Sequence, residues 1–197
     1  MNTNAEPRAA TRGRKGFSRF NRLLLAGLVA ALAALSLVAQ VALAGPPSPT
    51  GVADEIQVDE GNKVFLVGHG VGVQIYTCNG SVWSAAVPRA ELFDDNGMLI
   101  ITHFGGPTWR AKDNSTARGT VVDKVIVDET AIPWVLLSAK TTAVSDGDRL
   151  VDTSFIQRLE TTGGLTPPAA DCNAATANTV VEVPYTAEYV FWKHTAA

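Results

Sequence analysis

Short runs of strand-forming residues, each followed by a turn signal, restrict the fold of this chain more than any other feature. Residues 73–78 alternate with the period of a strand, and the turn pair Asn79-Gly80 follows them. Further runs of this kind begin at residues 64, 81, 89, 98, 119, 134, 155, 179 and 188. Beyond residue 44, no run of ten or more residues has a convincing helical period. The pattern predicts a mostly β fold, either an antiparallel β-sandwich or a barrel-like single domain.

Glycine and proline set several of the expected strand boundaries. We expect the glycine-rich stretch 68–72 to connect two separate strands, and Ser81-Val82-Trp83 to begin the next one. Pro133 permits either a strand that begins after it or a short buried helix.

The first 44 residues have the composition of an export signal. Six basic residues and one acidic residue precede an uncharged apolar run from Leu23 to Ala44, which ends in Ala42-Leu43-Ala44. This layout is typical of a secretory signal peptide, cleaved here after Ala44. The run is also long enough for an uncleaved membrane anchor. We expect a signal peptide over 1–44, a linker over 45–53, a β-rich domain over 54–194, and a periplasmic or extracellular location.

Removal of the leader changes the charge of the chain. The full sequence has 16 basic and 19 acidic residues and a formal net charge of −3. Without the six basic residues and the one acidic residue of the leader, ten and eighteen remain, and the net charge becomes −8. A nucleic-acid-binding protein needs a basic surface. The charge therefore argues against nucleic acid as a partner, and membrane contact is expected only if the leader is retained.

Cys78 and Cys172 are the only cysteines, and both follow the leader. In an exported protein an even pair favours a disulfide. Two free thiols are the alternative. A zinc site built on cysteine is disfavoured, because structural zinc needs four converging ligands.

Several segments beyond the leader form a set of motifs that covers nearly all of the remaining chain. They are Gly72–Cys78, His103–Trp109, Ala131–Leu137, Ile156–Arg158, Thr162–Gly164, Cys172 and Val183–Tyr189. In order and spacing they resemble the domain of unknown function 3455 (DUF3455) family of bacterial and fungal, mostly exported proteins. Asn114 stands where relatives typically have a glycine in an Asp-Gly-Ser turn. Asparagine also tolerates left-handed backbone, so we expect the turn to be retained.

Some fungal members of that family are labelled malate dehydrogenase, and the sequence tests this label. A dinucleotide-binding enzyme places Gly-x-Gly-x-x-Gly between a strand and a helix. Gly68, Gly70 and Gly72 have a different spacing and lead into a strand-like run. The chain has no dehydrogenase signature, and we expect no cofactor.

The segment 102–109 is the first candidate site. The imidazole of His103 can bind a metal or transfer a proton, and Gly105 and Gly106 allow a ligand to approach the backbone. With Trp109, these residues are the candidates for ligand binding. The favoured alternative is that His103 ends a strand and hydrogen-bonds a carbonyl group while its aromatic neighbours fill the core.

Arg158 is the second candidate, because an arginine in an apolar strand can bind a carboxylate or a phosphate. The alternative is a structural ion pair with Glu160, Asp152 or Glu182. The three histidines lack the spacing of metal ligands, and we expect no metal site.

The sequence offers little support for nucleophilic catalysis, since it contains no Gly-x-Ser-x-Gly or Ser-x-x-Lys motif. Our leading hypothesis is a non-enzymatic binding or envelope-associated module, whose partner is an unknown small molecule or envelope component. The alternative is a hydrolase or metal-assisted enzyme with a catalytic site near His103 and Arg158. Burial of His103 against a single backbone partner would weaken that alternative, and a polar cavity joining it to an acidic residue would favour it.

Overall fold

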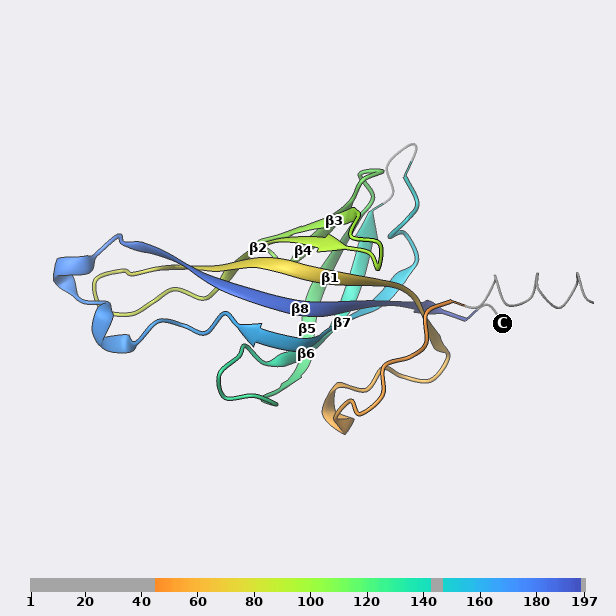
Figure 1. The fold of residues 1–197 in the computed structure, drawn as a ribbon, viewed down its shortest axis with the longest axis horizontal. Helices are drawn as coiled ribbons and strands as arrows, with labels where there is room; N and C mark the ends of the chain where they lie inside the picture. Colours follow the sequence, from red (N-terminus) through yellow and green to blue (C-terminus); the bar gives the residue numbers. More distant parts are fainter. Residues whose placement is uncertain (1–44, 143–146, 196–197) are drawn as a thin grey trace, which may run out of the picture. The chain divides into compact units, whose positions relative to one another are not determined.

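Eight antiparallel strands close into one barrel in the computed structural model, which describes residues 45–142 and 147–195 (Figure 1). Strands that follow each other in sequence pair with each other, and β8 pairs with β1 to close the barrel. The strands are β1 (Asn62–Thr77), β2 (Val87–Phe93), β3 (Leu99–Phe104), β4 (Thr108–Ala111), β5 (Thr116–Val125), β6 (Trp134–Thr142), β7 (Thr153–Gly163) and β8 (Val180–His194). The predicted β fold is confirmed, and of the two expected architectures it is the barrel.

Three short 3-10 helices complete the described part of the chain. They are η1 (Asp54–Ile56), η2 (Ala169–Asp171) and η3 (Ala174–Thr176). Within the described ranges, no helix is long and apolar enough to cross a membrane.

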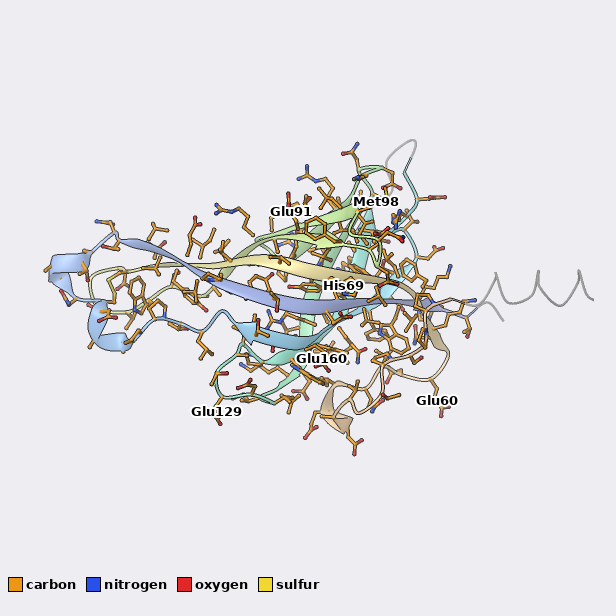
Figure 2. All side chains as sticks on the ribbon, in the orientation of Figure 1. Glu60, His69, Glu91, Met98, Glu129 and Glu160 are labelled. Atoms are coloured by element: carbon orange, nitrogen blue, oxygen red, sulfur yellow. A yellow bond between two sulfur atoms is a disulfide. The ribbon has the colours of Figure 1, made fainter. Side chains whose placement is uncertain are left out.

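Alternation along the strands separates an apolar interior from a charged exterior. On β8, Tyr189 and Phe191 are fully buried in the interior cluster, whereas Val190 belongs to a different cluster on the outside. Charged side chains such as those of Glu91 and Glu129 lie at the periphery (Figure 2). Aromatic residues of the last strand thus pack into the core.

The glycine-rich stretch 68–72 does not connect two strands, and that prediction was wrong. β1 runs through it without interruption for 16 residues. A Cβ at Gly72 would lie 2.2 Å from the carbonyl oxygen of Arg89 on β2, and one at Gly70 would lie 2.7 Å from the ring of Tyr189. These glycines therefore mark positions where neighbouring strands and an interior ring approach the backbone closely.

The segment after Cys78 also differs from expectation. Trp83 makes only an isolated β-bridge with Cys78, and the next strand begins at Val87. The side chain of Asn79 accepts hydrogen bonds from two following backbone N–H groups, each at 3.0 Å. These bonds hold residues 79–83 in a tight loop and so prevent a strand from starting at residue 81. After Pro133, a strand begins at Trp134, which is the first of the two alternatives that the sequence left open.

The Cys78–Cys172 disulfide is present, with a Cα separation of 5.3 Å and a sequence separation of 94 residues. It joins the loop after β1 to the loop before β8, where these two long strands run side by side beyond the others (Figure 1). The indole of Trp83 donates to the carbonyl of Pro168 across the same two loops, at 3.1 Å. The predicted pairing is confirmed, and it ties together two loops at one end of the barrel.

The turn between β4 and β5 helps to close the opposite end. Asn114 has a φ of 66°, so the expected left-handed turn is retained. Asp113 accepts hydrogen bonds from the hydroxyl and the N–H of Ser115, and from two backbone N–H groups at residues 148 and 149. The Ser115 hydroxyl and the backbone donors lower the pKa of Asp113 to about 2. The carboxylate thus binds two loops together.

A second apolar cluster lies on the outside of the barrel, under the N-terminal segment. Ile56 of η1 is fully buried in it, and Val52 and Ala53 pack against it. Gln157 of β7 donates to the carbonyl of Ile56 at 2.7 Å and accepts from the indole of Trp192 at 2.9 Å. The buried amide therefore links η1 to two strands of the barrel. The linker boundary after residue 53 stays a prediction.

Candidate ligand-binding site

His103 lies on β3 with its ring inside the barrel, where it is 3% exposed. Its Nδ1 is 3.0 Å from the carbonyl oxygen of Thr108. Because a carbonyl only accepts, Nδ1 carries the proton and Nε2 presents a lone pair. Burial lowers the pKa of His103 to about 4, and the positive charge of Arg158 adds to this effect. The ring is neutral at pH 7.

The segment 102–109 forms a hairpin in which β3 and β4 pair His103 with Trp109. Trp109 is 1% exposed and fills the core, as the favoured interpretation required. Phe104 does not, since it is only half-buried and the guanidinium of Arg110 lies 4.9 Å from its ring centroid. The hairpin therefore places one histidine and one indole side by side in the interior.

Arg158 reaches from β7 to the mouth of the barrel. Its Nε and Nη2 both donate to the carbonyl oxygen of Pro133, at 3.3 and 2.8 Å. The ion-pair alternative was wrong: among the described residues no carboxylate pairs with this guanidinium, and Glu182 pairs with Arg89 at 2.6 Å. The charge of Arg158 is thus held in place by a neutral backbone group.

Two tyrosines of β8 lie in the same part of the interior. The hydroxyl oxygens of Tyr185 and Tyr189 are 2.9 Å apart and share a hydrogen bond. Burial raises the pKa of Tyr185 and raises that of Tyr189 strongly. Both hydroxyls are therefore neutral at pH 7.

Two buried donors in this region have no hydrogen-bond partner in the described part of the chain. They are Nε1 of Trp109 and Nε2 of Gln74, whose residues are 1% and 2% exposed. An unsatisfied buried donor costs about 1–3 kcal/mol, so folded proteins rarely leave one without a protein, water or ligand partner. The described chain itself therefore supplies no acceptor for either of these donors.

Trp109 and Gln74 both line a cavity of about 210 Å³ at the end of the barrel that carries the β3–β4 turn. Its polar wall also includes His103, Arg158 and Tyr189, and its apolar wall includes Val121, Val135 and Leu137. Among the described lining residues there is no Asp, Glu, Ser, Thr or Cys. Arg158 alone among them is charged at neutral pH, because His103 is neutral there.

A wider hollow of about 640 Å³ adjoins this cavity and leads to solvent. The two share Gln74, Ala86, Val121, Val135 and Arg158. Leu165 and Val122 also line the hollow, and Val121 and Val122 are each 56% exposed. Exposed apolar side chains therefore border the entrance to the cavity, together with the charged residues Asp123 and Lys124.

Four of the residues predicted from sequence lie around the cavity, namely His103, Gly106, Trp109 and Arg158. Gly105 does not line it, and a Cβ there would lie 2.9 Å from the side chain of Val87. Sequence reasoning missed Gln74 and Tyr189. The alternation of side chains along β1 could have indicated Gln74, because residues 70, 72 and 74 lie on the same, inward face of the strand.

The other two histidines lie elsewhere. On the outside of the barrel, His69 Nδ1 is 2.6 Å from Glu188 and its Nε2 is 2.8 Å from Asp95. Carboxylates only accept, so both nitrogens donate, and the bonds with Asp95 and Glu188 raise the pKa of His69. His194 lies at the end of β8. In the described ranges no three His, Cys, Asp or Glu side chains are grouped to hold a metal.

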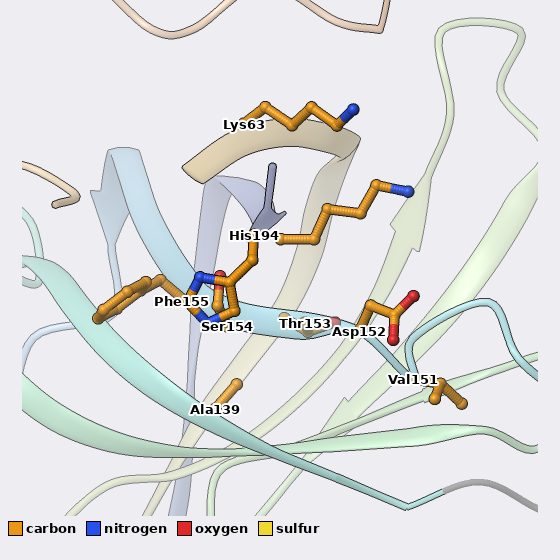
Figure 3. A pocket seen from close by; sticks show the side chains of 9 residues that line it. Lys63, Ala139, Val151, Asp152, Thr153, Ser154, Phe155 and His194 are labelled. Carbon is orange, nitrogen blue, oxygen red and sulfur yellow. The ribbon is translucent and has the colours of Figure 1, made fainter. Parts of the chain in front are cut away.

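A larger, open hollow of about 600 Å³ lies at the opposite end of the barrel (Figure 3). Lys63, Asp152 and His194 line it, and Figure 3 shows them spread around it without converging on one point. The Ser154 hydroxyl there already donates to the side chain of Asn62 at 2.7 Å. Among the described residues, none that lines this hollow has an unpartnered buried donor like those of the cavity beside His103.

The fold and the cavity define a closed eight-stranded antiparallel barrel, an architecture whose interior can hold one small ligand. Residues 59–193 match the family described as "Protein of unknown function (DUF3455)", and the chain belongs to this family. No curated protein and no solved structure matches the chain. The family resemblance is confirmed.

Proposed function

We propose that this protein is an exported, non-enzymatic barrel that binds a small molecule, free or as part of the cell envelope, in the cavity beside His103. The observation that carries the proposal is the pair of unpartnered donors on Trp109 and Gln74, both buried and both lining that cavity. An acceptor on a ligand would satisfy them.

Binding fits the geometry better than catalysis does. His103 and Arg158, on which the enzyme alternative rests, do line the same cavity. A general acid or base works best when its pKa is near the working pH, whereas burial lowers the pKa of His103 to about 4. The only hydrogen bond of this ring within the described chain is to the backbone of Thr108. The described lining offers no carboxylate to orient it.

Export is part of the proposal, and two features support it. The leader has the layout of a signal peptide. The Cys78–Cys172 disulfide suits an oxidising compartment such as the periplasm or the extracellular space. Intact-mass measurement of protein recovered from an exporting host tests this: a chain that begins at Gly45 is expected, and one that retains the whole leader would contradict cleavage.

A thermal-shift screen of the recovered protein tests binding. Small neutral, anionic and cationic molecules are added, and at least one class should raise the melting temperature in a saturable way. Trp109→Phe removes one unpartnered donor and should reduce that shift. Trp83→Phe is the matched control, because that indole bonds to Pro168 outside the cavity. If no class shifts the melting temperature, the binding function is wrong.

A further inference from the structure

We propose that the ligand is a small monocarboxylate with a compact apolar body, held with its carboxylate against Arg158 and its body against Val121, Val135 and Leu137. This inference rests on the proposed binding function and adds the chemical class of the ligand. Its basis is the combination of one fixed cation, two unpartnered donors and an apolar wall in a single cavity.

The charge of the cavity selects an anion. Arg158 uses Nε and Nη2 on the carbonyl of Pro133, and its remaining N–H donors have no carboxylate partner among the described residues. A guanidinium in a partly apolar site is stabilised by an anion that can accept several hydrogen bonds. The groups without a partner in the described chain are both donors, Nε2 of Gln74 and Nε1 of Trp109, which again favours a ligand group that accepts.

A single negative charge matches the single cation. A phosphate dianion would bring a second charge into a lining that has no second cation among its described residues. Burial of an uncompensated charge is costly, so a carboxylate fits better than a phosphate. A cationic ligand would face Arg158 directly and is disfavoured by repulsion.

The size and the walls of the cavity select the body of the ligand. An engineered cavity of about 150 Å³ holds benzene, so about 210 Å³ accommodates a molecule of the size of benzoate. Val135 and Leu137 are buried apolar residues, and Val121 continues the apolar wall toward the outer hollow. Burial of a compact apolar body against these residues adds affinity that acetate cannot gain.

Isothermal titration with benzoate, benzamide, benzylamine, acetate and inorganic phosphate tests the inference on the protein recovered from an exporting host. Benzoate should bind at least about tenfold more tightly than benzamide, which has the same shape without the charge. Acetate, phosphate and benzylamine should bind more weakly than benzoate. Arg158→Met should reduce benzoate affinity by at least about tenfold and change benzamide little. Arg110→Met, on the outer surface, is the matched control and should change neither.

The outcomes separate this inference from the binding function itself. If benzamide or phosphate binds as tightly as benzoate, the monocarboxylate class is wrong while the binding cavity stands. If none of the five probes binds, and the wider thermal-shift screen is also negative, both proposals fail. If Arg158→Met does not fold, as judged by circular dichroism, the benzoate and benzamide comparison on the unaltered protein decides the question alone.

Discussion

The imidazole of His103 lies flat against the indole of Trp109, with their ring centroids 4.2 Å apart and 7° between the ring planes. The two residues are cross-strand partners on β3 and β4. The stack fixes the indole in the barrel interior, where Trp109 lines the cavity and its buried Nε1 has no partner in the described chain. His103 thus has a structural role, and in the proposed function it positions a donor for the ligand.

The pKa of His103 makes the stability of the barrel depend on pH. The value falls from 6.5 to about 4 on folding, so the unfolded chain binds this proton more readily than the folded one. The neutral His103 ring therefore makes its full contribution to the free energy of unfolding above pH 6.5. As the pH falls from 6.5 to 4, this contribution decreases by about 3 kcal/mol. Urea unfolding at several pH values should show a steeper loss for the unaltered protein than for His103→Phe. Parallel curves would contradict the buried, neutral imidazole.

The disulfide is expected to contribute strongly to stability. It closes a loop of 94 residues, for which the chain-entropy treatment gives about 4–5 kcal/mol. Replacement of Cys78 and Cys172 by alanine should lower the free energy of unfolding by about that amount. Urea denaturation with and without reductant provides the measurement. Alkylation of two thiols in the unreduced protein would show that the bond is not formed.

Gly72→Ala should destabilise the barrel more than another glycine substitution of the same size. The new Cβ would lie 2.2 Å from the backbone of Arg89, so β1 and β2 would have to separate, at a cost of about 3 kcal/mol. Gly97→Ala is the control, because no atom lies within 4 Å of a Cβ built there. Only the positive φ of 74° disfavours a side chain at Gly97, which should lower the free energy of unfolding by about 1 kcal/mol. Equal melting temperatures for the two variants would contradict close packing at Gly72.

Gln157→Leu should loosen the N-terminal segment. The substitution removes the amide that bonds the Ile56 carbonyl and the Trp192 indole, so both buried groups lose this hydrogen-bond partner. The free energy of unfolding should fall by about 2 kcal/mol or more. Faster proteolysis before residue 62 and a lower free energy of unfolding are expected. Gln57→Leu is the control, because that exposed side chain makes one bond to Val52 and should matter little. Identical proteolysis of the two variants would show that the buried amide does not hold η1.

Local patterns predicted the strand content, the turn at Asn114, the disulfide and the burial of Trp109, because each depends on residues close in sequence or on composition. Closure of the barrel depends instead on pairing between β1 and β8, which are far apart in the chain. No local pattern distinguishes that closure from a sandwich. The prediction for the stretch 68–72 was wrong for a related reason. Its glycines are required by the close approach of Arg89 and Tyr189, which lie on other strands.

The candidate site was predictable only in part. Residue type alone made candidates of four residues, because each is unusual in apolar or glycine-rich surroundings. They are His103, Gly106, Trp109 and Arg158. Gln74 did not, because a glutamine in an alternating strand looks like an ordinary solvent-facing residue. Its burial and missing partner follow from the closed barrel.

The most direct test of the binding cavity is the indole region of the proton–nitrogen NMR spectrum during a titration with benzoate. The Nε1–H groups of Trp83 and Trp192 already donate to protein acceptors, whereas that of Trp109 has no acceptor in the described chain. The Trp109 signal, assigned through Trp109→Phe, should shift saturably while the signals of Trp83 and Trp192 stay in place. A Trp109 signal that does not respond to benzoate, or to any ligand that raises the melting temperature, would contradict a binding site at this cavity.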